Sequence, residues 1–206
     1  MPKTFPSPRP RLGFFGGSFD PPHLGHLQLA CLALKKANLD KLLLCPAHHA
    51  PLRPVPPMFS GEHRLGMIQS ICKVNEGLEA CDLEVKHGKV RYTYDTILEV
   101  MELYPKHDLF LLLGDDQLDR IKDWQEPEKL SKIVHFLVFS RGPNRSDIPP
   151  IPNIRLTFME NPLIDLSSTI ARGQLRSGKL PFTNLPLEVS NYLQENKLFP
   201  LTKKHS

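Results

Sequence analysis

The chain has 206 residues, a formal net charge of +4 and a pI near 8.9. This length is enough to bury a substantial core and is typical of one domain. Lysines and arginines are scattered among acidic residues, a pattern that favours a solvated mixed-charge surface over a nucleic-acid-binding stripe. We therefore expect no nucleic-acid partner.

The chain shows no apolar run long enough to cross a bilayer, and no apolar segment follows its first basic residues. Its four cysteines form no C-x-x-C pair and lie in or beside apolar segments, which indicates reduced core thiols. We expect a cytoplasmic protein with no membrane partner. Residues 1–10 are predicted to be a flexible N-terminal extension, residues 11–200 one domain, and residues 201–206 a flexible tail.

The first third of the domain reads as strand, helix, strand. Residues 12–15 form a short apolar run bounded by glycines, which predicts a buried strand. Leucines and a cysteine recur at three- and four-residue steps over residues 24–37, which predicts a helix that buries this face. Residues 41–45 form a second buried strand, so the segment is expected to be a βαβ unit. The five prolines of residues 46–60 predict an irregular loop.

The rest of the chain continues this alternation. Helices are predicted over residues 60–74, 93–104, 168–177 and 186–195. Strands are predicted over residues 80–85, 109–113, 133–139 and 154–158. The predicted fold class is therefore α/β, a Rossmann-like doubly wound parallel sheet with helices on both faces and a C-terminal helical portion.

The sequence G-G-S-F-D-P-P-H-L-G-H, residues 16–26, lies where the first strand meets the first helix. Gly16 and Gly17 permit a turn, and the unpaired N–H groups of a turn and a helix start attract anions. Gly25 costs about 1 kcal/mol relative to alanine in a helix, which indicates that a ligand such as a flat base approaches the backbone there. His23 and His26 are three residues apart, so both rings can reach one anion. The pattern predicts a triphosphate site.

A second phosphate site is predicted where the helix over residues 168–177 begins. Ser167, Ser168 and Thr169 place small hydroxyl side chains at the helix start. Arg172 follows Ser168 by four residues, so its guanidinium and the helix N-terminus can face the same phosphate.

These two segments resemble the signatures of the H-x-G-H nucleotidyltransferases, most closely bacterial nicotinate-nucleotide adenylyltransferase. The resemblance implies that His23 and His26 contact ATP phosphates and that the second element, similar to I-S-S-T-x-x-R, closes over the β- and γ-phosphates. It also implies contacts to the nucleotide from the backbone of the first turn. The implied ATP-binding residues, besides the catalytic His23, His26 and Arg172, are Gly16, Gly17, Ser18, Phe19, Gly25, Ser167, Ser168 and Thr169.

The resemblance extends to a mononucleotide site. Asp116 matches the carboxylate of a G-x-D element, and Tyr92 and Thr93 match an S-Y-T-x-x-T segment. Trp124 falls where the family carries an aromatic residue that stacks on a pyridine ring. Arg53 and Arg141 match basic residues near the bound nucleotide. The implied second substrate is nicotinate mononucleotide.

Two positions depart from the family pattern. Leu52 replaces the histidine of a P-P-H-[KR] loop, and whether His48 or His49 substitutes for it is open. Arg91 stands where a small serine is usual, which could alter the mononucleotide pocket.

The implied reaction is attack of the mononucleotide phosphate on the α-phosphorus of ATP, which forms deamido-NAD and releases pyrophosphate. A phosphate monoester has a second pKa of about 6, so this nucleophile needs no general base. We expect Mg²⁺ to be carried with ATP, and we expect no metal-ligating residues because no carboxylate cage is evident.

Three alternatives remain open at this stage: a related adenylyltransferase that uses nicotinamide mononucleotide, one that uses phosphopantetheine, and a non-catalytic nucleotide-binding regulator. The phosphopantetheine enzymes typically carry T-x-G-H and are shorter, and class I aminoacyl-tRNA synthetases are much longer. Whether the chain forms a homo-oligomer is also open.

Overall fold

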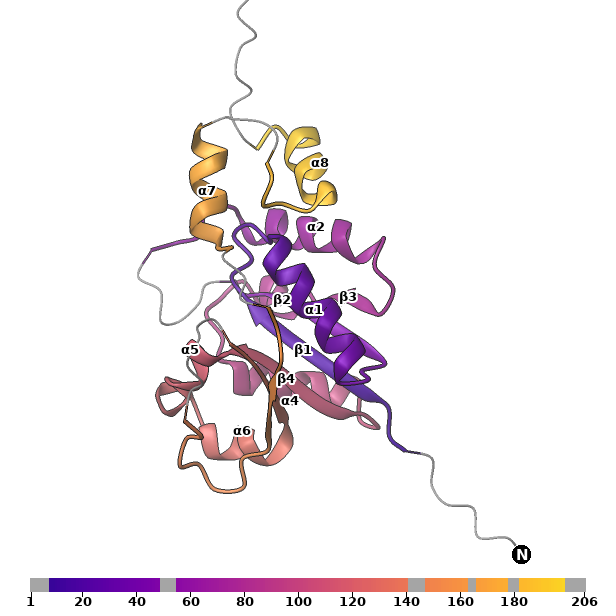
Figure 1. Ribbon diagram of the computed structural model, residues 1–206, viewed down its shortest axis with the longest axis vertical. Helices are drawn as coiled ribbons and strands as arrows, with labels where there is room; N and C mark the ends of the chain where they lie inside the picture. Colours follow the sequence, from indigo (N-terminus) through magenta and orange to yellow (C-terminus); the bar gives the residue numbers. More distant parts are fainter. Residues whose placement is uncertain (1–7, 49–54, 141–146, 163–165, 178–181, 199–206) are drawn as a thin grey trace, which may run out of the picture.

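A computed structural model describes residues 8–48, 55–140, 147–162, 166–177 and 182–198, and it forms an α/β fold around one parallel sheet (Figure 1). The strands are β1 (Arg11–Gly17), β2 (Lys41–Pro46), β3 (Leu78–Ala80), β4 (Asp108–Gly114), β5 (His135–Phe139) and β6 (Leu156–Met159). The helices are α1 (Leu24–Lys36), α2 (Gly61–Cys72), α3 (Leu83–His87), α4 (Thr93–Leu103), α5 (Asp115–Leu118), the 3₁₀ helix η1 (Ile121–Asp123), α6 (Pro127–Ile133), α7 (Ser168–Ser177) and α8 (Leu187–Glu195).

The strand order is β3-β2-β1-β4-β5-β6, and all five neighbouring pairs are parallel. The order reverses between β1 and β4, because the chain proceeds outward from β1 on one side and from β4 on the other. Ligands of such sheets bind beyond the carboxyl ends of the strands at this switch point. The predicted Rossmann-like doubly wound fold is confirmed, and it places the end of β1 where a ligand is expected.

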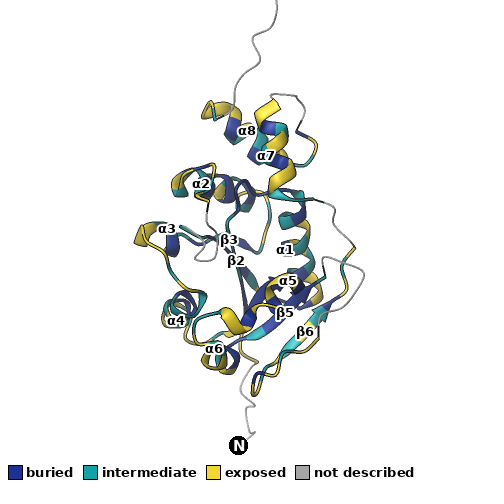
Figure 2. Cartoon of the chain, turned by 90° about the vertical axis from the view of Figure 1, so that its left-hand side faces the viewer, coloured by how far each residue is buried: buried dark blue, intermediate teal, exposed yellow. Residues whose placement is uncertain are grey.

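Alternating residues of the strands point to opposite faces of the sheet and belong to two hydrophobic layers. The first layer contains α1, α2, α7 and α8, and the second contains α4 and α6. Leu42 and Leu44 of β2 pack with α1, α2, α7 and α8, whereas Leu43 and Cys45 pack on the other face with α4 and α6. Figure 2 shows β2 as mostly buried. A strand that is buried on both faces loses the apolar–polar alternation of an exposed strand, which is why the sequence shows continuous apolar runs.

Helices α7 and α8 lie together at one end of the molecule, on the far side of α1 and α2 from α4 and α6 (Figure 1). Helix α8 packs on α2, where Tyr192 Oη lies 3.2 Å from His63 Nδ1. A side chain at Gly66 would collide with the Tyr192 ring, so α2 needs glycine at this contact. The C-terminal helical portion is thus fixed onto the first half of the sheet.

Most predicted elements are confirmed, with shifts of one or two residues at their ends. The buried face of α1 was predicted wrongly: its buried residues are Gly25, Ala30 and Ala33, while Cys31 is exposed. Small residues occupy the line of α1 that faces the sheet, and leucines flank it. Spacing alone had favoured the larger side chains.

The strand predicted over residues 80–85 is also wrong, because β3 ends at Ala80 and Leu83–His87 forms helix α3. One of the two acidic residues of this segment, Glu84, is buried and accepts a hydrogen bond of 3.0 Å from Thr96 Oγ1. Helix α6 was not predicted, although Pro127 at its first turn is a common helix start.

Two residues of the predicted N-terminal extension contact the sheet. Pro10 accepts a hydrogen bond of 2.8 Å from the Asp108 amide, and Arg9 donates to the carbonyls of Pro105 and Lys106. Within the residues that the structure describes, no helix is both long and apolar enough to cross a membrane.

Candidate active site

The turn between β1 and α1, residues 17–23, forms the centre of the candidate site. Gly16 and Gly17 end β1 beside the last residues of β2, and Phe19 adopts a left-handed φ of 45°. A Cβ on Gly16 would lie 3.1 Å from the Phe14 ring, so a side chain at this position would press on that ring. The sharp turn brings His23 to the N-cap of α1.

His23 and His26 lie face to face at the start of α1. Their ring centroids are 3.7 Å apart, and the Phe19 ring lies 4.9 Å from that of His26. The His23 amide donates to His26 Nδ1 at 3.2 Å. Because an amide N–H can only donate, Nδ1 is the acceptor and the neutral imidazole carries its proton on Nε2. His26 can therefore donate to an anion through Nε2.

Helix α7 joins the same turn from the other end of the chain. Ser168 Oγ donates to the Pro21 carbonyl at 3.2 Å, and Arg172 Nη1 donates to the Asp20 carbonyl at 2.8 Å. Ser167 caps the helix by accepting the Ile170 amide, and Thr169 accepts a bond from Arg172 Nη2. The structure thus brings the two predicted phosphate segments together, with the N-termini of α1 and α7 at one place.

Asp20, which the sequence did not single out, anchors this turn. Its carboxylate is buried and accepts the amides of Met58 and Phe59 at 2.8 and 2.9 Å. Arg172 Nη1 lies 3.6 Å from Asp20 Oδ2, so the arginine is aimed by both the carbonyl and the carboxylate of one residue.

Arg64 was missed as well, although it is almost fully buried in α2. Its guanidinium donates to backbone carbonyls of the phosphate turn and of neighbouring segments. A signal existed: Arg64 lies at helical spacing with Met67, Ile68 and Ile71, so an arginine stands within the apolar face of a predicted helix.

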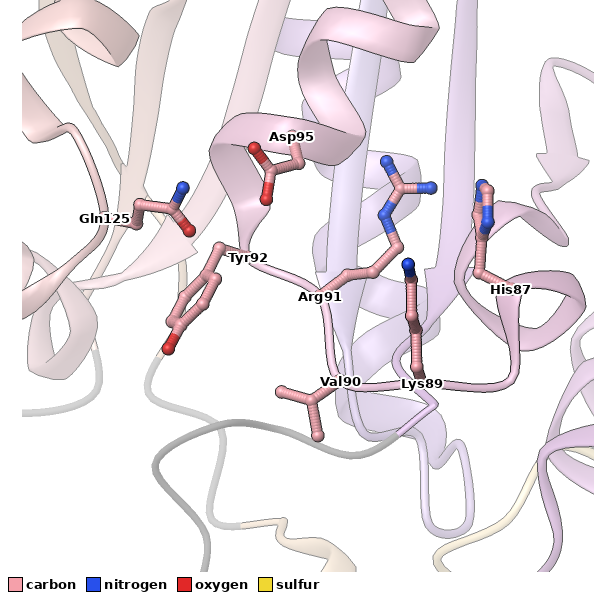
Figure 3. Close-up of a pocket in the computed structure, with 7 residues that line it drawn as sticks. All are labelled: His87, Lys89, Val90, Arg91, Tyr92, Asp95 and Gln125. Atoms are coloured by element: carbon pink, nitrogen blue, oxygen red, sulfur yellow. The ribbon is translucent and has the colours of Figure 1, made fainter.

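A pocket of about 510 Å³ lies beyond the carboxyl end of the sheet, at the start of α4. Figure 3 shows Tyr92 and Gln125 on one side of the pocket and the basic residues His87, Lys89 and Arg91 on the other. The lining residues are His87, Lys89, Val90, Arg91, Tyr92, Asp95 and Gln125. Tyr92 is the N-cap of α4 and Thr93 its first residue, so the predicted mononucleotide segment is at this pocket.

Arg91, one of the two departures from the family pattern, is turned toward α4 rather than toward Tyr92 (Figure 3). Its guanidinium lies 2.6 Å from Glu99 Oε2, and His87 Nε2 lies 3.0 Å from the same oxygen. The Arg91 and His87 contacts hold the pKa of Glu99 below its ordinary value, with the Arg91 hydrogen bond the largest cause. The positive charge of Arg91 is therefore paired with a carboxylate of the neighbouring helix α4.

The G-x-D segment, residues 114–116, lies at the end of β4, and its two aspartates differ in burial and contacts. Asp115 is buried and accepts bonds from the Asp116 amide and from Ser140 Oγ, which ties β4 to β5. Asp116 is exposed at the first turn of α5. Trp124 is half-buried against the second hydrophobic layer, next to the pocket residue Gln125.

The predicted residues Arg53 and Arg141 lie outside the described residues, as do Leu52 and His49. Among the described residues, no group of three or more histidines, cysteines and acidic residues is placed to hold a metal ion.

Two helix starts directed at one point of an open parallel sheet, each supported by side chains suited to phosphate, are the arrangement of a Rossmann-like nucleotidyltransferase. A family model described as "Cytidylyltransferase-like" matches residues 14–174. A Rhodopirellula baltica protein named "Probable nicotinate-nucleotide adenylyltransferase" is 32% identical over 96% of this chain and 97% of its own. An Oceanobacillus iheyensis protein with the same name is 34% identical over 91% of this chain and 96% of its own.

The chain belongs to the cytidylyltransferase-like family and, within it, to the nicotinate-nucleotide adenylyltransferases. Solved structures agree on the fold. A Plasmodium falciparum nicotinic acid mononucleotide adenylyltransferase complexed with NaAD aligns with a TM-score of 0.73 at 22% identity, over 93% of this chain and 99% of that one. Its complex with APC aligns with a TM-score of 0.72 at 22% identity and the same coverage.

Proposed function

We propose that this enzyme transfers the AMP moiety of ATP to nicotinate mononucleotide, which yields deamido-NAD and pyrophosphate for NAD biosynthesis. The observation that carries the proposal is the convergence of α1 and α7 on the Asp20–Pro21 turn, through Ser168 and Arg172. The names of the sequence relatives and the NaAD complex of the fold neighbour support the choice of substrate.

The chemistry we propose is a direct in-line displacement. The mononucleotide phosphate, which is largely dianionic at neutral pH with a second pKa of about 6, attacks the α-phosphorus of ATP. Pyrophosphate leaves from the opposite side, so negative charge builds on the α-phosphate and on the leaving group. His23, His26, Arg172 and the N-termini of α1 and α7 would stabilise this charge.

In this proposal the turn residues Gly16, Gly17, Ser18, Phe19 and Gly25 hold ATP through their backbone. Ser167, Ser168 and Thr169 contribute from α7. Mg²⁺ would enter with ATP as part of the substrate and would neutralise part of the phosphate charge.

The second substrate would occupy the pocket at the start of α4. Tyr92 lines it, and Thr93 and Trp124 are next to lining residues. Asp116 would contribute its carboxylate from the end of β4, and we retain Arg53 and Arg141 as predicted contacts to the mononucleotide.

We also propose that residues 11–200 form a single domain, supported by the contact of α8 with α2. The flexible ends, the cytoplasmic location, the lack of a nucleic-acid partner and the question of a homo-oligomer remain predictions from the sequence.

One assay tests the reaction. Pyrophosphate release from ATP is measured in parallel with nicotinate mononucleotide, nicotinamide mononucleotide and phosphopantetheine. We expect release to be fastest with nicotinate mononucleotide. Faster release with either other substrate would overturn the substrate assignment, and no release with any would favour a nucleotide-binding regulator.

A further inference from the structure

Among the described residues, Arg64 has the largest fully buried side chain, with 1% exposure. Burial lowers its pKa, because the protein interior penalises the charged form, while the negative charges of Asp20, Glu62 and Glu84 oppose this shift. An arginine nonetheless stays protonated in proteins. A buried permanent cation is costly unless its donors are satisfied, so its contacts need an explanation.

All the hydrogen bonds that the structure gives this guanidinium go to backbone carbonyl oxygens. Nη1 donates to the carbonyl of Ser18 at 2.8 Å and to that of Ala47. Nη2 donates to the carbonyl of His48 at 2.9 Å, and Nε donates to that of Phe59 at 3.1 Å. These carbonyls belong to three segments: the turn after β1, the chain just after β2, and the chain just before α2.

Asp20 completes the connection from the other side. Its carboxylate accepts the amides of Met58 and Phe59, so Phe59 is connected to the turn through both Asp20 and Arg64. Arg172 donates to the Asp20 carbonyl from α7. The turn is therefore held between a buried arginine beneath it and the candidate catalytic arginine beside it.

The bond to Ser18 has a direct consequence for the turn. A trans peptide is planar, and its C=O and N–H point in opposite directions. Because the Ser18 carbonyl points to Arg64, the Phe19 amide of the same peptide points away from the buried guanidinium. Arg64 thus determines the direction of an amide that the proposed function assigns to ATP.

We propose that Arg64 is a positioning residue for adenylyl transfer, which orients the phosphate turn by binding the Ser18 carbonyl while it fixes the turn to residues 47, 48 and 59. This inference rests on the proposed function of the same site. Arg64 does not contact substrate; it acts through the turn. Its loss should therefore impair the use of ATP and leave the separate mononucleotide pocket intact.

The test uses Arg64→Lys and Arg64→Met in the full chain. Lysine keeps the charge but lacks the planar fork that reaches several carbonyls at once. A misplacement of about 1 Å can cost about 100-fold in rate, so we expect Arg64→Lys to lower kcat/KM for ATP by about 10- to 100-fold. Arg64→Met should lose at least as much. The affinity for nicotinate mononucleotide, measured by calorimetry, should change less than about twofold.

Tyr192→Phe is the matched control, because it removes a different contact of α2, the one to His63, and touches no part of the turn. We expect it to lower the melting temperature slightly and to leave both kinetic constants unchanged. If folded Arg64→Lys protein used ATP normally, or lost affinity for both substrates equally, the positioning role would be wrong.

A measurement on the unaltered protein covers the case in which the variants do not fold. Hydrogen exchange is followed with and without a non-hydrolysable ATP analogue. We expect ligand protection in residues 16–23 to be accompanied by protection of the Met58 and Phe59 amides. Protection of residues 16–23 alone would overturn the coupling. This readout needs ATP binding but no turnover, so it separates failure of this inference from failure of the proposed reaction.

Discussion

The two sides of the candidate site are built in different ways. On the ATP side, Asp20, Arg64 and Arg172 join segments far apart in the sequence through partly buried hydrogen bonds. On the mononucleotide side, Tyr92 is 46% exposed and Asp116 lies open at a helix start. A preorganised anion site costs little reorganisation when charge develops, whereas an exposed aromatic surface gains its burial from the ligand. The two sides therefore predict different responses to mutation.

The largest effect is expected for His26→Ala on the ATP side. Removing a donor aimed at developing charge costs about 100- to 1,000-fold in kcat, and the half-exposed ring contributes little to the core. Steady-state pyrophosphate release measures the loss. His107→Ala is the control, because its ring packs on Tyr104 at the other end of β4. Near-normal turnover in folded His26→Ala protein would remove the histidine from the mechanism.

Arg172→Ala should come next. A hydrogen bond to a charged group contributes about 1.5–3 kcal/mol, so kcat/KM for ATP should fall by about 10- to 100-fold. The affinity for the mononucleotide should change much less. Arg176→Ala, one turn further along α7 and exposed, should leave both values unchanged. Equal losses for both substrates in Arg172→Ala would contradict the separation of the two sides.

On the mononucleotide side, Trp124→Leu should reverse this pattern. Stacking of a base on an aromatic ring is worth about 1–3 kcal/mol, so KM for the mononucleotide should rise about tenfold while KM for ATP stays near its original value. Tyr104→Leu, a change in the same hydrophobic layer, controls for lost packing. If both variants raise the same constants, Trp124 serves the core and not the ligand.

The smallest effect concerns Glu84, which lies between the two sides. Burial raises the pKa of its carboxyl above the ordinary 4.5, while the Thr96 hydrogen bond and the charges of Arg91 and Arg64 partly oppose this. An acid with a raised folded pKa contributes stability that is present below its unfolded pKa and is lost as pH rises through its folded pKa.

Glu84→Gln removes the ionisable group, and with it the loss of stability at higher pH, and keeps an oxygen that can accept the Thr96 hydrogen bond. Its free energy of unfolding, relative to the original protein, should therefore increase as pH rises from about 4 to 7. Denaturant melts at several pH values measure this difference. The exposed Glu102→Gln on α4 should show no such trend. A flat difference for Glu84→Gln would mean that the carboxylate is compensated in the fold.

The sequence predicted the fold and the ATP segments because both depend on local patterns. Buried strands produce apolar runs, and a glycine turn followed by a capped helix start has a recognisable spacing. The range of α7 was predicted without error, and Ser168 and Arg172 both donate hydrogen bonds to the turn, whereas their shared phosphate contact stays a prediction.

What the sequence did not provide depends on contacts between distant residues. Arg64 has backbone partners whose identity no side-chain pattern encodes. Glu84 was placed in a predicted strand over residues 80–85, because a buried acid bonded to Thr96 looks the same in sequence as an exposed one. The prediction of the buried face of α1 was wrong because the close contact of this helix with the sheet leaves room for alanine but not for leucine.

The packing of α7 against Asp20 has a consequence for how the protein folds during synthesis. Ala171, Leu175, Val189 and Leu193 are buried in the same hydrophobic layer as Phe19 and β2. During synthesis the sheet, α1 and α2 leave the ribosome first, with this layer only partly covered and the phosphate turn lacking Arg172. The last helices to emerge cover the rest of this apolar surface and bring Ser168 and Arg172 to the turn. We therefore expect a chain truncated before α7 to lose stability and the proposed activity together.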